Sequence, residues 1–232
     1  IRGPSATCSR FCPRRVGGGQ NLPVLVVNSN LAEAFPYPHE NAVEFRNSGV
    51  ALLFQKLIDV YYAASAGFKF SEFHIDPEDE DAYYSIFILP NLCTDSVTIY
   101  SANASISRLR KTSLLADWDL AKRHLNVCTV SSVNCGQCGK CVRTLTALDA
   151  LGKLDEFSGV FDIGAYQKKR AMNIGYAWAS KKESFYDELY PALKKNGKLG
   201  ISAFPWFLMF KLAKPVERFM RKLSPEKRRS LV

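Results

Sequence analysis

The chain is organised around residues 134–152, which read Asn134-Cys135-Gly-Gln-Cys138-Gly-Lys-Cys141-Val-Arg-Thr-Leu-Thr-Ala-Leu-Asp-Ala-Leu-Gly152, and a fourth cysteine, Cys128, stands seven positions before Cys135. Each Cys-x2-Cys turn lets two thiolates approach one metal ion from a single loop, and the intervening glycines ease the bending of the backbone. Four thiolates complete a tetrahedral zinc site with no open position, so the spacing predicts a zinc that stabilises the fold and does not activate water. The predicted ligands are Cys128, Cys135, Cys138 and Cys141.

Two other interpretations of the cysteines stay open at this point. An iron–sulfur cluster also takes four thiolates, although the ferredoxin motif has a different spacing and a Cys-Pro pair that this segment lacks. Cysteines without a metal are the other alternative. For a bound metal, the neighbouring Lys140 and Arg143 would offset the negative charge of the four thiolates.

The other cysteines bear on the compartment. The chain has seven cysteines, an odd number, and its longest apolar run, residues 201–210, contains Pro205 and is too short to span a membrane. We also find no secretory signal. An odd count without such a signal favours a reducing compartment, so we expect a cytoplasmic protein.

Charge is distributed unevenly along the 232 residues. Residues 168–232 contain 16 basic and 5 acidic residues, whereas residues 1–167 contain 15 basic and 17 acidic residues. With 47% apolar residues, the chain can bury a core, and disorder throughout is excluded. Hydrolase signatures such as Gly-x-Ser-x-Gly and His-Glu-x-x-His are absent from the sequence.

Hydrophobic patterns predict alternating strands and helices ahead of the cysteines. We expect strands at residues 22–27, 68–75 and 96–100, helices at 49–64, 106–116 and 118–125, and a solvated acidic loop at 76–81. This order is typical of a parallel sheet with helices on both faces. Three strands are few for a doubly wound domain, so the pattern predicts the back half of one.

Residues 125–152 resemble the C-terminal end of PP-loop ATP pyrophosphatase-like proteins related to 7-cyano-7-deazaguanine synthase, which carry a four-cysteine zinc site that leads into a helix ending at Gly. The similarity extends upstream through Val26-Val27-Asn-Ser-Asn-Leu31, Phe45-Arg46-Asn47 and Ser107-Arg108-Leu-Arg-Lys111-Thr112, and covers roughly residues 22–152. The resemblance implies a HUP-type (adenine nucleotide alpha hydrolase-like) α/β fold. It also implies ligase chemistry in which ATP and Mg²⁺ adenylate a carboxyl or carbonyl oxygen before a nitrogen nucleophile attacks.

The chain departs from this family in one respect. The family holds ATP phosphates with a Ser-Gly-Gly-x-Asp-Ser loop on its first strand, and this sequence has no such stretch. We therefore expect the chain, which begins at Ile1, to be the C-terminal portion of such an enzyme and to bind ATP poorly by itself. Catalytic residues are not identified. The residues expected to face a nucleotide, a small molecule or a modified base in the complete protein are Asn28, Asn30, Arg46, Asn47, Arg108 and Lys111.

These six residues also have ordinary structural interpretations. Asn after a strand is common turn chemistry, and an Arg or Lys on a helix often only covers apolar surface or faces solvent. The predicted domain organisation is a flexible lead-in (1–21), the C-terminal half of a HUP-type domain (22–127), the zinc segment with its helix (128–152) and a basic, mostly helical tail (153–232).

The tail suggests an alternative function. Phe204-Pro-Trp-Phe-Leu-Met-Phe210, followed by Lys211, Lys214, Arg218, Arg221 and Lys222, is a basic amphipathic pattern. It would suit an inactive, zinc-braced scaffold that binds a protein partner or an anionic membrane and sits at the membrane periphery. The simpler interpretation is a helix that packs its apolar face on the domain. No sequence module for DNA binding is present.

Overall fold

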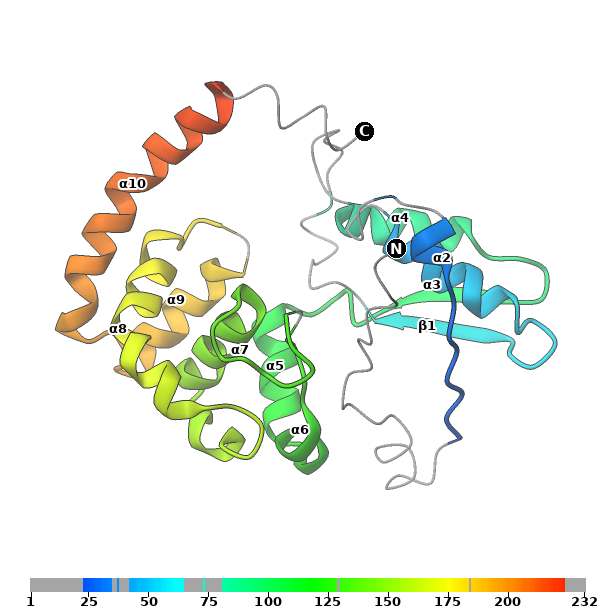
Figure 1. Cartoon of the computed structure of the whole chain (residues 1–232), viewed down its shortest axis with the longest axis horizontal. Coiled ribbons are helices and arrows are strands. Elements are labelled where there is room, and N and C mark those ends of the chain that lie inside the picture. Colours follow the sequence, from blue (N-terminus) through cyan, green and yellow to red (C-terminus); the bar gives the residue numbers. More distant parts are fainter. Residues whose placement is uncertain are drawn as a thin grey trace, which may run out of the picture. The chain divides into compact units, whose positions relative to one another are not determined.

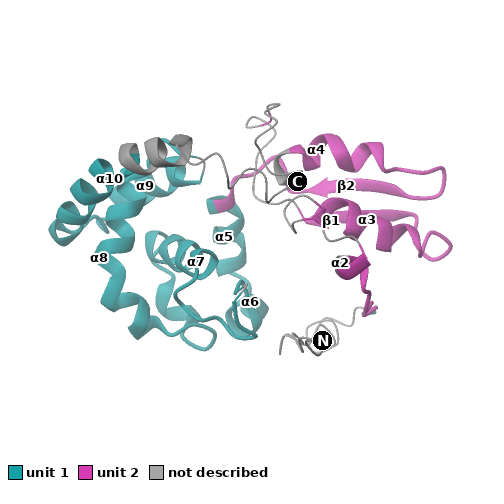
Figure 2. Ribbon diagram, turned by 45° about the horizontal axis from the view of Figure 1, so that its top comes forward, with its two compact units in different colours: residues 1–24, 109–230, 232 teal, residues 25–108, 231 magenta. Residues whose placement is uncertain are grey.

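The structure is a computed structural model that describes residues 23–34, 37, 42–64, 73, 81–128, 130–183 and 185–223 (Figure 1). By packing, the described chain divides at residue 108 into two compact units (Figure 2). Residues 25–108 form unit 2, and the described residues from 109 onward, together with residues 23–24, form unit 1. The four domain limits expected from the sequence stay a prediction.

Unit 2 contains one βαβ element. Its helices and strands are α2 (Leu31–Ala34), α3 (Val43–Leu52), β1 (Val60–Ala64), α4 (Asp81–Asn91) and β2 (Thr98–Ala102). The two strands pair in parallel, with Val60 opposite Thr98 and Ala64 opposite Ala102. Parallel neighbours need a crossover connection, which here includes α4. A parallel sheet is therefore present, as the sequence predicts, with two strands among the described residues.

The sheet of unit 2 is covered on one side. Ala63 and Ile99 point into a small core that also contains Leu89 of α4. On the opposite side, the rings of Tyr62 and Tyr100 stack on each other with centroids 5.6 Å apart, and both side chains are exposed. Within the described part of unit 2, helices thus cover one face of the sheet, whereas the sequence analysis expected both faces to be covered.

Two predicted elements of unit 2 are wrong. Residues 23–27 of the expected strand 22–27 form no strand, and Leu25 and Val26 are exposed, because an apolar run forms a strand only where a neighbour pairs with it. The expected helix 49–64 ends at residue 52 as part of α3, and its last five residues form β1. A run that is apolar on every side fits a helix or a buried strand equally well.

Three predicted elements next to the unit boundary are confirmed. The strand expected at 96–100 is β2, and the helices expected at 106–116 and 118–125 are α5 (Arg108–Ala116) and α6 (Asp119–His124). The expected lead-in 1–21 lies outside the described residues. So do the strand 68–75 and the acidic loop 76–81, apart from one residue of each, Phe73 and Asp81.

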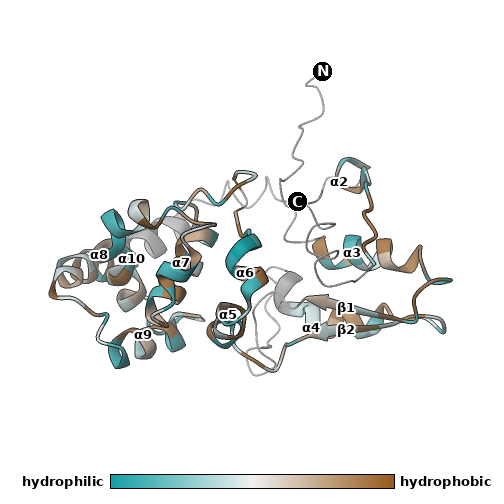
Figure 3. Ribbon diagram, turned by 90° about the horizontal axis from the view of Figure 1, so that it is seen from below, coloured by the Kyte–Doolittle hydropathy of each residue, from teal (hydrophilic) through white to brown (hydrophobic). Residues whose placement is uncertain are grey.

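Unit 1 is helical within the described residues. After α5 and α6 follow α7 (Gly139–Ala150), the 3-10 turn η3 (Leu154–Phe157), α8 (Ile163–Ala179), α9 (Tyr186–Lys195), the 3-10 turn η4 (Ile201–Ala203) and α10 (Phe204–Leu223). Figure 3 shows that these helices carry both hydrophilic and hydrophobic residues along their length. The mostly helical tail expected from the sequence is confirmed as far as residue 223.

Helix α7 lies between two cores. Cys141, Leu145 and Leu148 follow an i, i+4, i+7 spacing, which places them on one helix face, where they meet Phe157 and Tyr166. A different face carries Ala147 and Ala150, whose small side chains let α8 and α9 approach. Because α7 contributes to both cores, its position determines how the rest of unit 1 packs.

Helices α8 and α10 approach each other at Gly175, which is buried in α8. A Cβ atom at position 175 would lie 2.5 Å from the Cβ of Trp206 and 2.8 Å from both the Ala203 carbonyl oxygen and the Phe207 amide nitrogen. We expect Gly175→Ala to lower the free energy of unfolding by about 1–3 kcal/mol, because the backbone of α10 must shift to admit the methyl group.

Urea denaturation of the full chain measures this loss, and Gly159→Ala is the matched control. Nothing lies within 4 Å of a Cβ at position 159, and its φ is not positive. Equal stability of the two variants would contradict the close contact between α8 and α10.

None of the described helices is both long enough and apolar enough to cross a membrane.

Candidate metal centre

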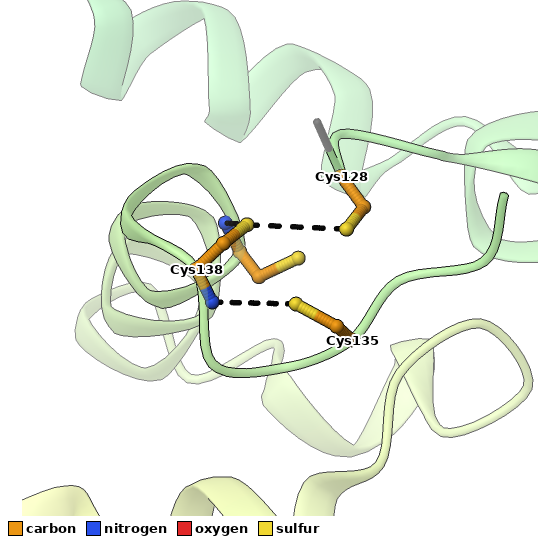
Figure 4. Close-up of side chains that lie close together, drawn as sticks. Cys128, Cys135 and Cys138 are labelled. Atoms are coloured by element: carbon orange, nitrogen blue, oxygen red, sulfur yellow. Dashed lines mark hydrogen bonds between the residues drawn. The ribbon is translucent and has the colours of Figure 1, made fainter. Parts of the chain in front are cut away.

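The four predicted ligands converge in unit 1. The Sγ atoms of Cys128, Cys135, Cys138 and Cys141 all lie within 4.8 Å of one another. Figure 4 shows the sulfur atoms of Cys128, Cys135 and Cys138 drawn together from two loops and the start of α7. The sulfurs of Cys128 and Cys138 are 4.0 Å apart. A metal bonded to four sulfurs at 2.3 Å in a tetrahedron separates them by about 3.8 Å, so the side chains fit a single ion with small adjustments.

Two asparagines shape the loop that carries Cys128. Asn134 donates from Nδ2 to the carbonyl oxygens of Leu125 (2.8 Å) and Val160 (3.0 Å), and its Oδ1 accepts from the amide of Val127 (2.9 Å). Asn126 Oδ1 accepts a hydrogen bond from the amide of Cys128 at 3.1 Å. The Asn134 bonds tie the segment before Cys128 to the loop before Cys135, so that both cysteines reach one point.

The start of α7 presents its free amides to the sulfurs. Cys138 is the N-cap residue, and its Sγ accepts from the amide of Cys141 at 3.4 Å. The Cys135 sulfur accepts from the amide of Cys138 at 3.3 Å, across the turn in which Gly136 adopts φ 69°. The first amides of a helix and its dipole favour negative charge, so this geometry stabilises thiolates.

The pKa values of Cys128 and Cys141, the first and last of the four cysteines, are shifted in opposite directions. Burial acts to raise the pKa of Cys128, but amides of Cys135, Val130 and Ser131 donate to its sulfur and bring the pKa down to about 6. Burial raises the pKa of Cys141 far above its usual range, and its contact with the Cys138 sulfur acts in the same direction. A metal ion supplies the positive charge that a buried Cys141 thiolate would need.

The basic residues beside the cysteines lie on the first turns of α7. Lys140 is exposed, and Arg143 Nε donates to the Gly139 carbonyl oxygen at 3.2 Å. Both charges are therefore on the same helix as Cys141. The site as a whole offers four ligands and no open coordination position, which is the arrangement of a structural metal.

Asn134 should influence metal binding although it is not a ligand. We expect Asn134→Ala to weaken zinc binding by about 10–100-fold, because groups that orient metal ligands have effects of this size. Competition with a chromogenic zinc chelator measures the affinity. Gln137→Ala is the matched control, because Gln137 lies in the same loop and is exposed. If both variants bind zinc as tightly as the parent chain, Asn134 does not position the ligands.

The other residues singled out in the sequence are dispersed over both units. Asn28 and Asn30 lie in an exposed irregular segment of unit 2, and the Asn30 carbonyl oxygen accepts from the amides of the first turn of α2. Asn47 lies exposed on α3 of the same unit. Arg108 begins α5, and Lys111 follows it on that helix in unit 1. Their role in ligand binding stays a prediction.

Arg46 lines a cavity of unit 2. The cavity has a volume of about 590 Å³, and the lining residues are otherwise mostly apolar: Leu31, Tyr37, Ala42, Phe45, Gly49 and Leu53. Arg46 Nη2 donates to the Tyr37 carbonyl oxygen at 3.0 Å. The cavity thus combines apolar walls with one guanidinium group, which suits a partly apolar ligand with an acceptor group.

Three polar residues with structural roles were not predicted from the sequence: Asn134, which is partly buried, and Asp149 and Glu44, which are buried. In the sequence, Asn134 stands out only as the residue before Cys135, and no sequence pattern indicates the hydrogen bonds of its side chain. Asp149 of α7 is buried against Arg170. Glu44 of α3 is buried, and burial raises its pKa; the pKa of nearby Tyr61 is raised by burial and by the charge of Glu44. A lone acid within an apolar helix gives no hint of burial.

Protein-family models, curated protein sequences and solved structures were each compared with the chain, and none of them matches it.

Proposed function

We propose that the four cysteines bind one structural zinc ion, and that the chain is the C-terminal portion of a PP-loop ATP pyrophosphatase-like enzyme. The proposal depends most on one observation, the convergence of four cysteine sulfurs within 4.8 Å at the start of α7. With ATP and Mg²⁺, such an enzyme adenylates a carboxyl or carbonyl oxygen and then transfers nitrogen to it. In this chain the zinc ligands hold the fold and take no part in that chemistry.

The spacing of the sulfurs favours a single ion over an iron–sulfur cluster. In a cluster, each cysteine binds a different iron or a different side of the inorganic core, which places the cysteine sulfurs further apart than one shared ion does. Here all four sulfurs lie within 4.8 Å of one another, as ligands of one shared ion do. Zinc is the ion that most commonly takes four thiolates in a closed tetrahedral site.

The structural effect of zinc would be to join segments that are distant along the chain. Cys128 follows α6, Cys135 and Cys138 lie in the turn before α7, and Cys141 is inside α7 and belongs to the core around Phe157. One ion would therefore fasten α6 and α7 at the point where the core is formed. Such metal binding contributes directly to folding.

Four features support the enzymatic part of the proposal. The cysteine motif and its helix resemble those of the family, and unit 2 has a parallel βαβ element. The two-stranded sheet of unit 2 leaves Tyr62 and Tyr100 exposed on one face. Because a sheet of two strands is only marginally stable by itself, this is what part of a larger sheet would look like. In addition, Arg46 lines a cavity large enough for a small molecule. A nucleotide or modified-base substrate would be bound on unit 2.

Elemental analysis of the purified chain tests the metal. We expect about one zinc per chain, no iron, and no visible absorption of the iron–sulfur type. Iron together with visible absorption would show that the site holds an iron–sulfur cluster and not zinc. A metal-free chain would contradict the metal site altogether.

The enzymatic part has a separate test. The coding sequence upstream of Ile1 should encode a Ser-Gly-Gly-x-Asp-Ser loop, and the protein that includes it should release pyrophosphate from ATP. The 232-residue chain alone should bind ATP weakly or not at all in calorimetry, since it lacks that loop. A start codon directly at Ile1, or tight ATP binding by the 232-residue chain, would contradict the family assignment and leave the zinc site untouched.

A further inference from the structure

Helix α10 is apolar on two opposite faces. One face packs on α8: the rings of Phe207 and Trp178 stack with centroids 4.4 Å apart, and Phe210 meets Tyr176 edge-on at 5.2 Å. Lys214 closes this contact, because its Nζ bonds to Glu183 and to the Ser180 hydroxyl and lies over the Tyr176 ring. The packed face therefore fixes α10 on unit 1.

The opposite face is exposed within the described part of unit 1. Leu208, Met209 and Leu212 are 42%, 46% and 73% exposed, and Ile201, just before the helix, is 94% exposed. Positions 205, 208, 209 and 212 follow the i, i+3, i+4, i+7 spacing of one helix face. In the sequence the same spacing continues with Val216, Phe219 and Leu223. We call Pro205, Leu208, Met209 and Leu212 the outer stripe.

The outer stripe lies on a helix that is rich in basic residues. Residues 204–223 contain five basic residues and one acidic residue. Lys211 is exposed beside the stripe, and its Nζ lies 5.6 Å from the centre of the Phe207 ring. A contiguous exposed apolar row marks an interaction surface, and a helix that adds Lys and Arg to such a row suits the boundary between lipid headgroups and acyl chains.

We propose that the outer stripe of α10 binds the surface of an anionic lipid bilayer, with the helix lying in the plane of the membrane. Leucine and methionine side chains would enter the acyl boundary, and Lys211 beside the stripe would contact acidic headgroups. The inference does not depend on the metal or on the enzymatic proposal.

The charges argue for lipid over other occupants. A symmetric contact with a second copy would bring two basic α10 helices against each other, and like charges repel. Nucleic acid would use the basic residues, but exposed Leu and Met side chains offer neither hydrogen bonds nor stacking to bases. An anionic bilayer satisfies both the apolar row and the positive charge.

Vesicle co-sedimentation of the full chain tests the proposal. One set of vesicles contains phosphatidylcholine alone, and the other contains phosphatidylcholine mixed with phosphatidylserine. We expect binding to the mixed vesicles that weakens as salt is raised, and little binding to the neutral ones. The double variant Leu208→Glu/Leu212→Glu should reduce binding at least about tenfold, because each leucine would lose its burial in lipid. Lys211→Gln should reduce it by a smaller factor.

Leu114→Glu is the matched control, because Leu114 is an exposed leucine on another helix of unit 1, α5 (52% exposed). Its vesicle binding should equal that of the parent chain. Circular dichroism should give all variants the same melting temperature, since the replaced side chains are exposed. Three results would overturn the proposal: no binding to the mixed vesicles, equal binding to neutral vesicles, or full binding by the double variant. Concentration-dependent dimerisation that only the double variant abolishes would also overturn it, in favour of a second copy.

Discussion

Replacement of the four clustered cysteines together by alanine is expected to lower the melting temperature of the helical unit by at least about 10 °C. Cys128, Cys135, Cys138 and Cys141 would fasten α6 to α7, and α7 contributes to both cores of unit 1. Structural zinc in small domains contributes free energy comparable to the whole stability of a domain, so its loss should destabilise all of unit 1. Circular dichroism at 222 nm of the full chain, which has helices mainly in unit 1, measures the effect.

Removing the metal from the parent chain should lower the melting temperature in the same way as the cysteine replacements. A strong zinc chelator added to the parent chain should lower the melting temperature by a similar amount, and added zinc should restore it. The quadruple variant should respond to neither reagent. Cys93→Ser is the control, because Cys93 is an exposed thiol of unit 2 outside the cluster. If the quadruple variant melts at the temperature of the parent chain, the metal site and the family resemblance built on it are both wrong.

The second large effect is expected at Asp149, at the other end of α7. Its carboxylate is buried, and Arg170 of α8 donates to it from Nε at 2.6 Å and from Nη2 at 3.3 Å. Tyr166 donates its hydroxyl to the same carboxylate at 3.1 Å. Arg170 Nη2 also donates to the carbonyl oxygen of Lys198, after α9. One carboxylate thus links α7, α8 and the chain after α9.

Asp149→Ala should lower the free energy of unfolding by about 3 kcal/mol, since removing one partner of a buried pair leaves the other charge poorly compensated. Arg170 is partly exposed, which places the expected loss at the lower end for such pairs. Urea denaturation with an unchanged m-value measures it. Asp155→Ala, which removes an exposed carboxylate of η3, should change stability by less than about 0.5 kcal/mol. A loss below about 1 kcal/mol in Asp149→Ala would show that the network contributes little.

Local sequence patterns were informative where the chemistry is local. Four cysteines in fourteen residues point to one metal because short turns bring them together, and the structure places their sulfurs in contact distance. The end of α7 was equally visible: Gly152 adopts φ 70°, and the Lys153 amide returns to the Leu148 carbonyl oxygen, as is typical after a helix. Helices α5 and α6 were located for the same reason.

Other features depend on partners distant in the chain. Residues 23–27 have the composition of a strand but pair with no neighbour among the residues that the structure describes, whereas residues 60–64 form a strand because residues 98–102 lie beside them. Helix α4 was not predicted, since its mixture of aromatic and aliphatic residues has no clear period. Asn134 also bonds to Val160, 26 positions away, and Asp149 bonds to Arg170, 21 positions away, and no local pattern encodes such contacts.

X-ray absorption at the zinc edge of the purified full chain examines the ligands directly. We expect one shell of four sulfur atoms at about 2.3 Å from zinc, unchanged in Cys93→Ser. A shell that contains nitrogen or oxygen ligands, or a spectrum from protein with less than about half an equivalent of zinc, would contradict it.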